Sequence, residues 1–541
     1  MSKRNMTASQ ASFAQTVHAD IQRSVFRRPS TLKTTFNCGE LVPIYIDEVL
    51  PGDTRKIDVS AVARLTTPIF PTMDNLYLEF YAFFVPNRLV WDGWEELNGE
   101  NKTSAWVPAV APALVPQFNF ATNIPMVSNY VEPGGIGDYY GLPFMKDTGA
   151  GDGFVVGMDL STYPVSALPF RGYALIWNEW FRDENLQAPL VINKGNTEPT
   201  NTAVAYVPNN SLLTVNKFHD YFTSCLPAPL KGTSPLIPIE LNQLIPVVTG
   251  KSRAAGKSGT VSMYSDNVTS DGVNPLVSNK PMYFTPMTGT DNFGAGVTVN
   301  VAGTSAGAGS SMQAVIPNNL WADARGLQIN DTTISELRTL FQIQKLLERD
   351  ARGGTRYIEM LKAHFGVDAG DYRLQRPEFL GHYTTMVGMQ QVPQTSSTDN
   401  TSPQGNVAAY SLTGVRDAVI CNKTFAEHGF IHIFAVARQV KTYQNGCERF
   451  WFRKERFDFY YPELAHISEQ PVYNKEIFAF GNATAGNGVF GYQEAWADYR
   501  YKPNRLSGQM RSNVENSLDV WHYADDNQPK PLDSQKHHCQ Q

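Results

Sequence analysis

Two short stretches of the chain carry residue types that could act in catalysis. The first, "GKSRAAGKS" at 250–258, resembles a phosphate-binding loop. That loop has four residues between its first glycine and its Gly-Lys pair, and here there are five. The second, "GTSAG" at 303–307, places Ser305 in the pattern of a nucleophile elbow, but "AGAGSSM" after it is a poor start for the helix that an elbow requires. We therefore predict no catalytic residue in either stretch.

The histidines, cysteines and acidic residues do not form a recognisable metal or acid–base site. The ten histidines include no HExxH pattern and no Cys/His zinc grid. His537, His538 and Cys539 are adjacent near the end of the sequence, where neighbouring residues cannot easily surround one ion. A glycosidase would need two carboxylates facing one cleft, and the spacing of the acids indicates no such pair. We predict a protein without catalytic activity, metal or cofactor.

A run of basic and aromatic residues, "WADYRYKPNRLSGQMR" at 496–511, could bind single-stranded nucleic acid. Such binding combines cations on phosphates with rings stacked on bases. The candidate contacts are Arg500, Tyr501, Lys502, Arg505 and Arg511. A second interpretation has Tyr499 and Tyr501 in the core, with Arg500 and Lys502 alternating outward. The sequence leaves both open, and "RKER" at 453–456 is a further basic patch.

The first 36 residues form a second basic segment. They are polar and have few large apolar groups, which favours an arm over a folded element. This segment carries six basic residues against one acid, Asp20. The candidate nucleic-acid contacts among them are Lys3, Arg4, Arg23, Arg27 and Arg28, and the sixth basic residue is Lys33. Because the whole chain has a net charge of −6, contact with nucleic acid must be local.

The composition indicates a protein that hides part of its surface in an assembly. Charged residues make up 18% of the chain, below the roughly 25% usual in soluble domains, and buried interfaces are depleted in Lys, Glu and Asp. Five distant cysteines without a CxxC pair suit a reducing compartment. We expect no secretory signal, because the first 17 residues have no apolar core of the required length. We expect no membrane insertion, because four prolines interrupt the uncharged stretch 103–131.

The hydrophobic patterns predict strands near both ends, with helices and a long loop between them. The expected strands are 40–50, 54–65, 75–86, 429–440 and 448–461. The expected helices are 91–99, 167–184, 331–350 and 355–366. Residues 235–316 contain ten glycines and only four aromatic residues, which is typical of a large insertion. Together these patterns predict one β-sandwich with insertions.

Several long stretches, in fixed order, give the chain its resemblance to a known family. They are "HADIQRSVFRRP" (18–29), "GELVPIYIDEVLPGD" (39–53), "KFHDYFTSCLPAPLKG" (217–232), "FQIQKLLERDARGGTRYIEMLKAHFG" (341–366), "LQRPEFLG" (374–381) and "FGYQEAWADYRYKPNRLSG" (490–508). The sequence resembles the major capsid proteins of microviruses, small icosahedral single-stranded DNA phages, and in particular the gokushovirus branch. The resemblance spans nearly the full chain and weakens from about 235 to 316.

The resemblance implies an eight-stranded viral jelly roll in a virion protein, assembled in the cytoplasm of a host bacterium. Sixty copies would close a T = 1 shell around circular single-stranded DNA. Implied partners are a small basic DNA-packaging protein, an internal scaffolding protein and a receptor on the host cell surface. The implied divisions are the basic arm 1–36, the first part of the jelly roll 37–234, the insertion 235–316, and the helices with the remaining strands 317–541.

The resemblance also implies that the insertion gathers at threefold axes as a surface protrusion that meets the host. Candidate contacts there are Gly256, Lys257, Tyr264, Asp271, Phe293 and Ser305. The alternative function that we keep is a surface protein whose main role is to bind a host receptor through this insertion.

Overall fold

The structure is a computed structural model, and its contacts divide the chain into two compact units. One unit joins residues 1–231 with 348–541, and the other comprises 232–347. The structure describes residues 22–64, 74–98, 114–118, 131–146, 155–160, 162–197, 205–208, 210–235, 247–249, 263–265, 315–317, 320–322, 334–352, 357–366, 374–388, 391–395, 404–405, 407–410, 413–465, 469–480 and 486–524.

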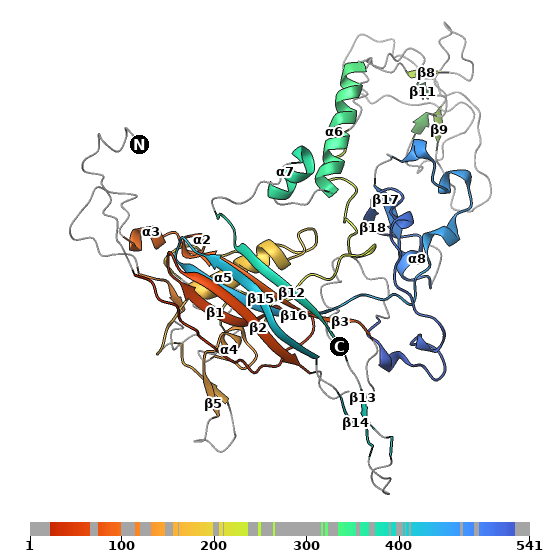
Figure 1. Cartoon of the computed structure of the whole chain (residues 1–541). Coiled ribbons are helices and arrows are strands. Elements are labelled where there is room, and N and C mark those ends of the chain that lie inside the picture. Colours follow the sequence, from red (N-terminus) through yellow and green to blue (C-terminus); the bar gives the residue numbers. More distant parts are fainter. Residues whose placement is uncertain are drawn as a thin grey trace, which may run out of the picture. The chain divides into compact units, whose positions relative to one another are not determined.

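The first unit is built around an antiparallel sheet of four strands (Figure 1). In spatial order these strands are β1 (Val42–Val49), β16 (Gly429–Gln439), β3 (Leu76–Pro86) and β12 (Glu378–Val387). A second sheet pairs β2 (Thr54–Ala63) with β15 (Thr413–Thr424). The strands predicted at 40–50, 54–65, 75–86 and 429–440 are therefore confirmed.

The pairing of these strands is nested along the chain. The first strand, β1, pairs with β16, the second, β2, pairs with β15, and the third, β3, pairs with β12. Each pair is antiparallel, so that one half of the chain folds back along the other half. β16 also pairs with β3, and this joins the first and third of these pairs into one sheet.

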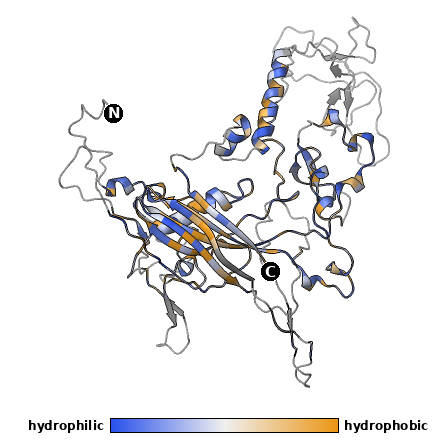
Figure 2. Ribbon diagram, viewed as in Figure 1, coloured by the Kyte–Doolittle hydropathy of each residue, from blue (hydrophilic) through white to orange (hydrophobic). Residues whose placement is uncertain are grey.

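The strands β16 and β3 of this sheet bury side chains on both faces, and successive side chains of each strand point to opposite sides. In β16, Ile431, Ile433 and Ala435 pack toward the second sheet, together with β15 residues such as Ile420. Phe434 and Val436 pack into a separate core, which also contains residues of helix α5. Figure 2 shows hydrophobic and hydrophilic residues alternating along the strands of the sandwich.

Helix α5 (Leu168–Ile176) covers the second face of this sheet and confirms the helix predicted at 167–184. It continues as one π-helical turn, η1 (Trp177–Phe181). The hydroxyl of Tyr173 donates to the carbonyl of Leu41, 2.9 Å away, and accepts from the N–H of Leu213 at 2.9 Å. The helix is therefore joined to the segments beside β1 by polar contacts as well as by packing.

The remaining elements are short. The helices of the first unit include α2 (Asn87–Val90), α3 (Trp94–Leu97), α4 (Ile136–Tyr139), α7 (Tyr357–Phe365), α8 (Asn474–Ile477), and the 3₁₀ turns η3 (Arg449–Phe452), η4 (Arg456–Asp458), η5 (Pro462–Leu464), η6 (Ala497–Tyr499), η7 (Gly508–Met510) and η8 (Asp519–Trp521). Its paired short strands are β4 (Gln117–Phe118) with β7 (Val165–Ser166), β5 (Phe144–Lys146) with β6 (Val155–Gly157), β13 (Gln391–Pro393) with β14 (Val407–Tyr410), and β17 (Gln470–Tyr473) with β18 (Val489–Gln493).

The strand predicted at 448–461 is wrong, because this segment forms the 3₁₀ turns η3 and η4. The carboxylate of Asp458 accepts hydrogen bonds from the backbone N–H groups of Lys454 and Glu455, at 2.8 and 2.9 Å. Such local side-chain bonds to the backbone compete with a sheet ladder. The aromatic residues that resembled a strand pattern are exposed instead of buried.

Two helices follow the predicted insertion. Helix α6 (Ile334–Arg352) confirms the helix predicted at 331–350, and α7 confirms the helix predicted at 355–366. Gly366 ends α7 with φ at 68°, a left-handed conformation that glycine adopts without strain. None of the helices that the structure describes has the length and apolar character needed to cross a membrane.

The second unit contains two short antiparallel strand pairs. β8 (Val247–Thr249) pairs with β11 (Leu320–Ala322), and β9 (Met263–Ser265) pairs with β10 (Val315–Pro317). These pairs are also nested, since β9 and β10 lie between β8 and β11 in the sequence. In this way they bring the two ends of residues 266–314 together.

His432, on β16, gives the fold a testable pH dependence. The side chain is fully buried, its Nδ1 lies 3.0 Å from the hydroxyl of Tyr140, and burial lowers the pKa of His432 to about 3. The folded-state pKa of His432 lies below its unfolded value, so the neutral imidazole contributes to the free energy of unfolding. This contribution is complete above pH 6.5 and is lost as the pH falls toward 3.

Replacement of His432 by glutamine should remove this pH dependence. Between pH 7 and pH 4.5 the wild type should lose about 2–3 kcal/mol more unfolding free energy than H432Q, at about 1.4 kcal/mol per pH unit. Denaturant unfolding at both pH values measures the difference. Equal losses in the two proteins would contradict a buried neutral histidine.

Candidate functional site

The described part of the basic arm, residues 22–36, is extended and exposed, and it is tied to the turn between β1 and β2. The guanidinium of Arg23 donates to the carbonyl of Gly52. Arg28 forms two hydrogen bonds with the carboxylate of Asp47, at 2.7 and 3.2 Å, and this carboxylate raises the pKa of Arg28. The same carboxylate lies 3.4 Å from Arg55. The arm is thus held at this end by polar contacts.

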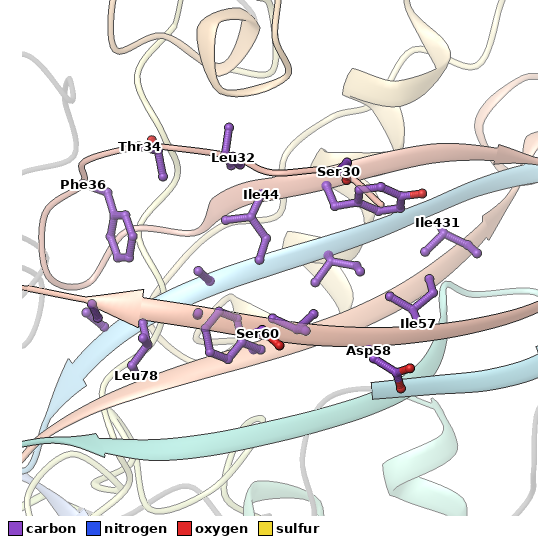
Figure 3. A pocket seen from close by; sticks show the side chains of 18 of the residues that line it. Ser30, Leu32, Thr34, Phe36, Ile44, Ile57, Asp58, Ser60, Leu78 and Ile431 are labelled. Carbon is purple, nitrogen blue, oxygen red and sulfur yellow. The ribbon is translucent and has the colours of Figure 1, made fainter. Parts of the chain in front are cut away.

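A cleft of about 2600 Å³ lies between the arm and the sandwich (Figure 3). Leu32 and Phe36 of the arm line it on one side. Its floor consists of apolar side chains from β1, β2, β3 and β16, among them Ile44, Ile57, Leu78 and Ile431. Such a floor can accept apolar groups.

Three cations of the arm form no ion pair with an acidic side chain of the described residues. Arg27 and Lys33 are exposed and have no ion-pair partner among the described residues. Arg23 contacts a carbonyl group, which leaves its positive charge uncompensated. These three side chains are available to negatively charged groups of a partner. Lys3 and Arg4 lie outside the described residues.

The C-terminal run at 496–511 is ordered around Trp496. This residue is buried, and its indole N–H donates to the carbonyl of Leu464 at 2.9 Å. Its φ of 64° turns the chain sharply into η6. Tyr499 and Tyr501 are 54% and 52% exposed, so the interpretation that places them in the core is wrong.

The cations of this run have partners within the chain. Arg500 bonds to Glu494, and this contact raises the pKa of Arg500. Lys502 bonds to Glu448, and Arg505 lies 3.6 Å from the same carboxylate. Arg511 donates to the carbonyl of Gln444 at 3.3 Å. Both acids lie outside the run, which explains why the run by itself looks strongly basic.

The predicted host contacts lie almost entirely outside the described residues. This holds for Gly256, Lys257, Asp271, Phe293 and Ser305. Tyr264 lies on β9, opposite Ile316 of β10. The near-matches to catalytic motifs and the tail residues His537, His538 and Cys539 also fall outside the described residues.

Buried acids in the described residues are parts of local networks that the sequence did not reveal. The carboxylate of Glu79 on β3 lies 2.5 Å from the guanidinium of Arg438. The carboxylate of Glu476 accepts from the hydroxyl of Tyr221 at 3.0 Å, and burial raises the pKa of Glu476. Each network links segments distant in sequence, which suits a structural role. Across the described residues, no group of three His, Cys, Asp or Glu side chains could hold a metal ion.

Comparison with known proteins shows that nearly the whole chain is similar to one kind of virus protein, the capsid protein. The family described as "Capsid protein (F protein)" matches residues 14–540. The chain is 40% identical to the capsid protein VP1 of Spiroplasma virus 4, over 97% of this chain and 88% of that protein. It is 38% identical to capsid protein VP1 of Bdellovibrio phage phiMH2K, over 96% of this chain and 88% of that protein. The VP1 of Chlamydia phage 1 is 37% identical, over 95% and 88%.

Proposed function

Since the chain belongs to the microvirus capsid protein (F protein) family, we propose that sixty copies of it close a T = 1 icosahedral shell around circular single-stranded DNA. Membership in the family makes the chain a structural subunit of an oligomeric capsid and a component of the virion. The observation that carries the proposal is the match along nearly the whole chain, at 37–40% identity, to capsid proteins of three viruses.

The proposed fold of the subunit is the eight-stranded viral jelly roll. A jelly roll is a double-sheet antiparallel sandwich with Greek-key connections, common in capsid proteins. The nested pairs β1–β16, β2–β15 and β3–β12 support it, because they form a long antiparallel ribbon that wraps into two facing sheets. The pairing of β16 with β3 places the pairs β1–β16 and β3–β12 side by side in one sheet.

The proposed genome contact is mainly the basic arm. Arg23, Arg27 and Lys33 carry charges that no acid of the described residues neutralises. The remaining proposed contacts contribute less to DNA binding: Arg500, Lys502, Arg505 and Arg511. The first three must break an ion pair with an acid before they can bind a phosphate. At a net charge of −6, the chain also suits a separate small basic packaging protein on the DNA. An internal scaffolding protein completes the proposed partners, with assembly in the host bacterial cytoplasm.

The share of the arm can be measured by the salt dependence of DNA binding. The variant R23Q/R27Q/K33Q should reduce the magnitude of the negative slope of log K against log[salt] for single-stranded DNA by about 2, at about 0.7 per phosphate contact. The matched variant R500Q/K502Q/R505Q should lower it by less than about 1, because these cations are already paired. Fluorescence anisotropy with the full-length chain gives both slopes. An unchanged slope in the arm variant would remove the arm from the genome contact.

The proposed second role of the chain is attachment to the host through the insertion. The observation that favours it is that residues 232–347 form a compact unit of their own, and long insertions in compact proteins tend to be functional. The candidate contacts with a receptor are the six residues predicted above: Gly256, Lys257, Tyr264, Asp271, Phe293 and Ser305. A variant of this proposal makes receptor binding the main role of the chain.

The nested strand pairs suggest a clean deletion to test attachment. Because Ser265 of β9 lies opposite Val315 of β10, residues 266–314 can be replaced by a short Gly-Asn turn that keeps the pair closed. Particles of this variant should assemble but adsorb at least tenfold less to the host, as measured by loss of free particles from suspension. Normal adsorption by intact particles would refute attachment through residues 266–314, and with it the contacts proposed for Asp271, Phe293 and Ser305.

A further inference from the structure

Eight aromatic side chains gather on one exposed surface of the first unit. We call this the aromatic surface, and it comprises residues 449–461 and 499–501. Its rings are between 36% and 71% exposed: Phe450, Trp451, Phe457, Phe459, Tyr460, Tyr461, Tyr499 and Tyr501. Soluble proteins rarely leave so many large rings together in water, and such patches mark sites of interaction.

The two segments of the aromatic surface touch each other. The rings of Tyr460 and Tyr499 lie 6.1 Å apart, centre to centre. The backbone N–H of Tyr460 donates to the hydroxyl of Tyr499 at 3.5 Å. The ammonium of Lys502 lies 5.4 Å from the ring centre of Phe450. These contacts join the segment 449–461 to the segment 499–502.

A buried frame holds these rings in place. Arg453 is nearly buried, bonds to Asp498, and lies 4.3 Å from the ring centre of Tyr499. Trp496 anchors the second segment through its bond to Leu464, and Asp458 fixes the turn that carries Phe457. Rings that are already held in position lose little entropy on binding.

The charges around the patch favour a protein partner over nucleic acid. Residues 448–461 and 494–505 together hold seven basic and five acidic side chains. Arg453, Arg500, Lys502 and Arg505 are each paired with one of these acids. A surface of this kind offers little net charge to phosphates. A mixture of both signs suits contact with another copy of the same chain, whereas a surface of one sign would repel its copy.

We propose that the aromatic surface is buried against a second copy of this chain in the assembled shell. This inference rests on the proposed function, in which copies of the chain close the capsid. Exposed aromatic and arginine side chains are the types that dominate binding energy at protein interfaces. Trp451 and Phe457, at 68% and 71% exposure, are the side chains with the most area to bury.

The proposal is tested by substitutions that leave the subunit fold intact. The variants W451A and F457A should reduce the yield of shells at least about tenfold, as measured by sedimentation, because loss of a central interface aromatic weakens association strongly. Their melting temperatures before assembly should match the wild type. Y163A, which removes a ring that is 63% exposed outside the patch, serves as the matched control and should assemble normally.

Normal shell yields for both W451A and F457A would overturn the proposal, and so would an equal loss in Y163A. Either result leaves the capsid function standing, because the wild type still forms shells in the same experiment. A wild type that forms no shells in infected host cells, where its proposed partners are present, would instead refute the proposed function itself.

Hydroxyl-radical oxidation read by mass spectrometry separates a protein partner from DNA. Relative to the unassembled chain, oxidation of Trp451 should fall at least about tenfold both in empty shells and in DNA-filled particles. Trp496, which is buried in the subunit, provides the internal reference. Protection of Trp451 only in DNA-filled particles would overturn the proposal in favour of base stacking. Equal oxidation in all three states would overturn it as well.

Discussion

The structure of this chain depends on one strand, β16, which is bonded along both edges and buried on both faces. It pairs with β1 on one side and with β3 on the other. Its alternate side chains serve two separate cores, one against the second sheet and one against α5. A slip of one residue would exchange these two sets of side chains. The register of β16 therefore decides which of its side chains enter each core, and the cleft beside the arm is lined by Ile431, Ile433 and Ala435 of this strand.

Much of the sandwich was predictable from sequence, because its strands carry strong local signals. Residues 75–86 and 429–440 are rich in aromatic and β-branched side chains, and both form strands buried on two faces. Residues 448–461 carry a similar signal but form 3₁₀ turns, since Asp458 bonds to its own backbone neighbours. Composition alone cannot separate these cases, because the outcome depends on local hydrogen bonds.

The candidate site was less predictable, because charge depends on contacts between distant segments. The cations at 500, 502 and 505 look free in the sequence, but in the structure Arg500 pairs with Glu494, and Lys502 and Arg505 share Glu448. In contrast, Arg27 and Lys33 of the arm have no such partner among the described residues. The two basic segments therefore separate into an arm suited to phosphates and an aromatic surface suited to protein.

The central claim is that this chain closes a shell around single-stranded DNA. Electron cryo-microscopy of particles purified from infected host cells tests it most directly. We predict closed T = 1 shells of sixty subunits, with density for nucleic acid inside the shell. Each subunit should contain the nested sandwich of β1–β16, β2–β15 and β3–β12. Monodisperse monomers from the same cells, with no shells, would contradict it.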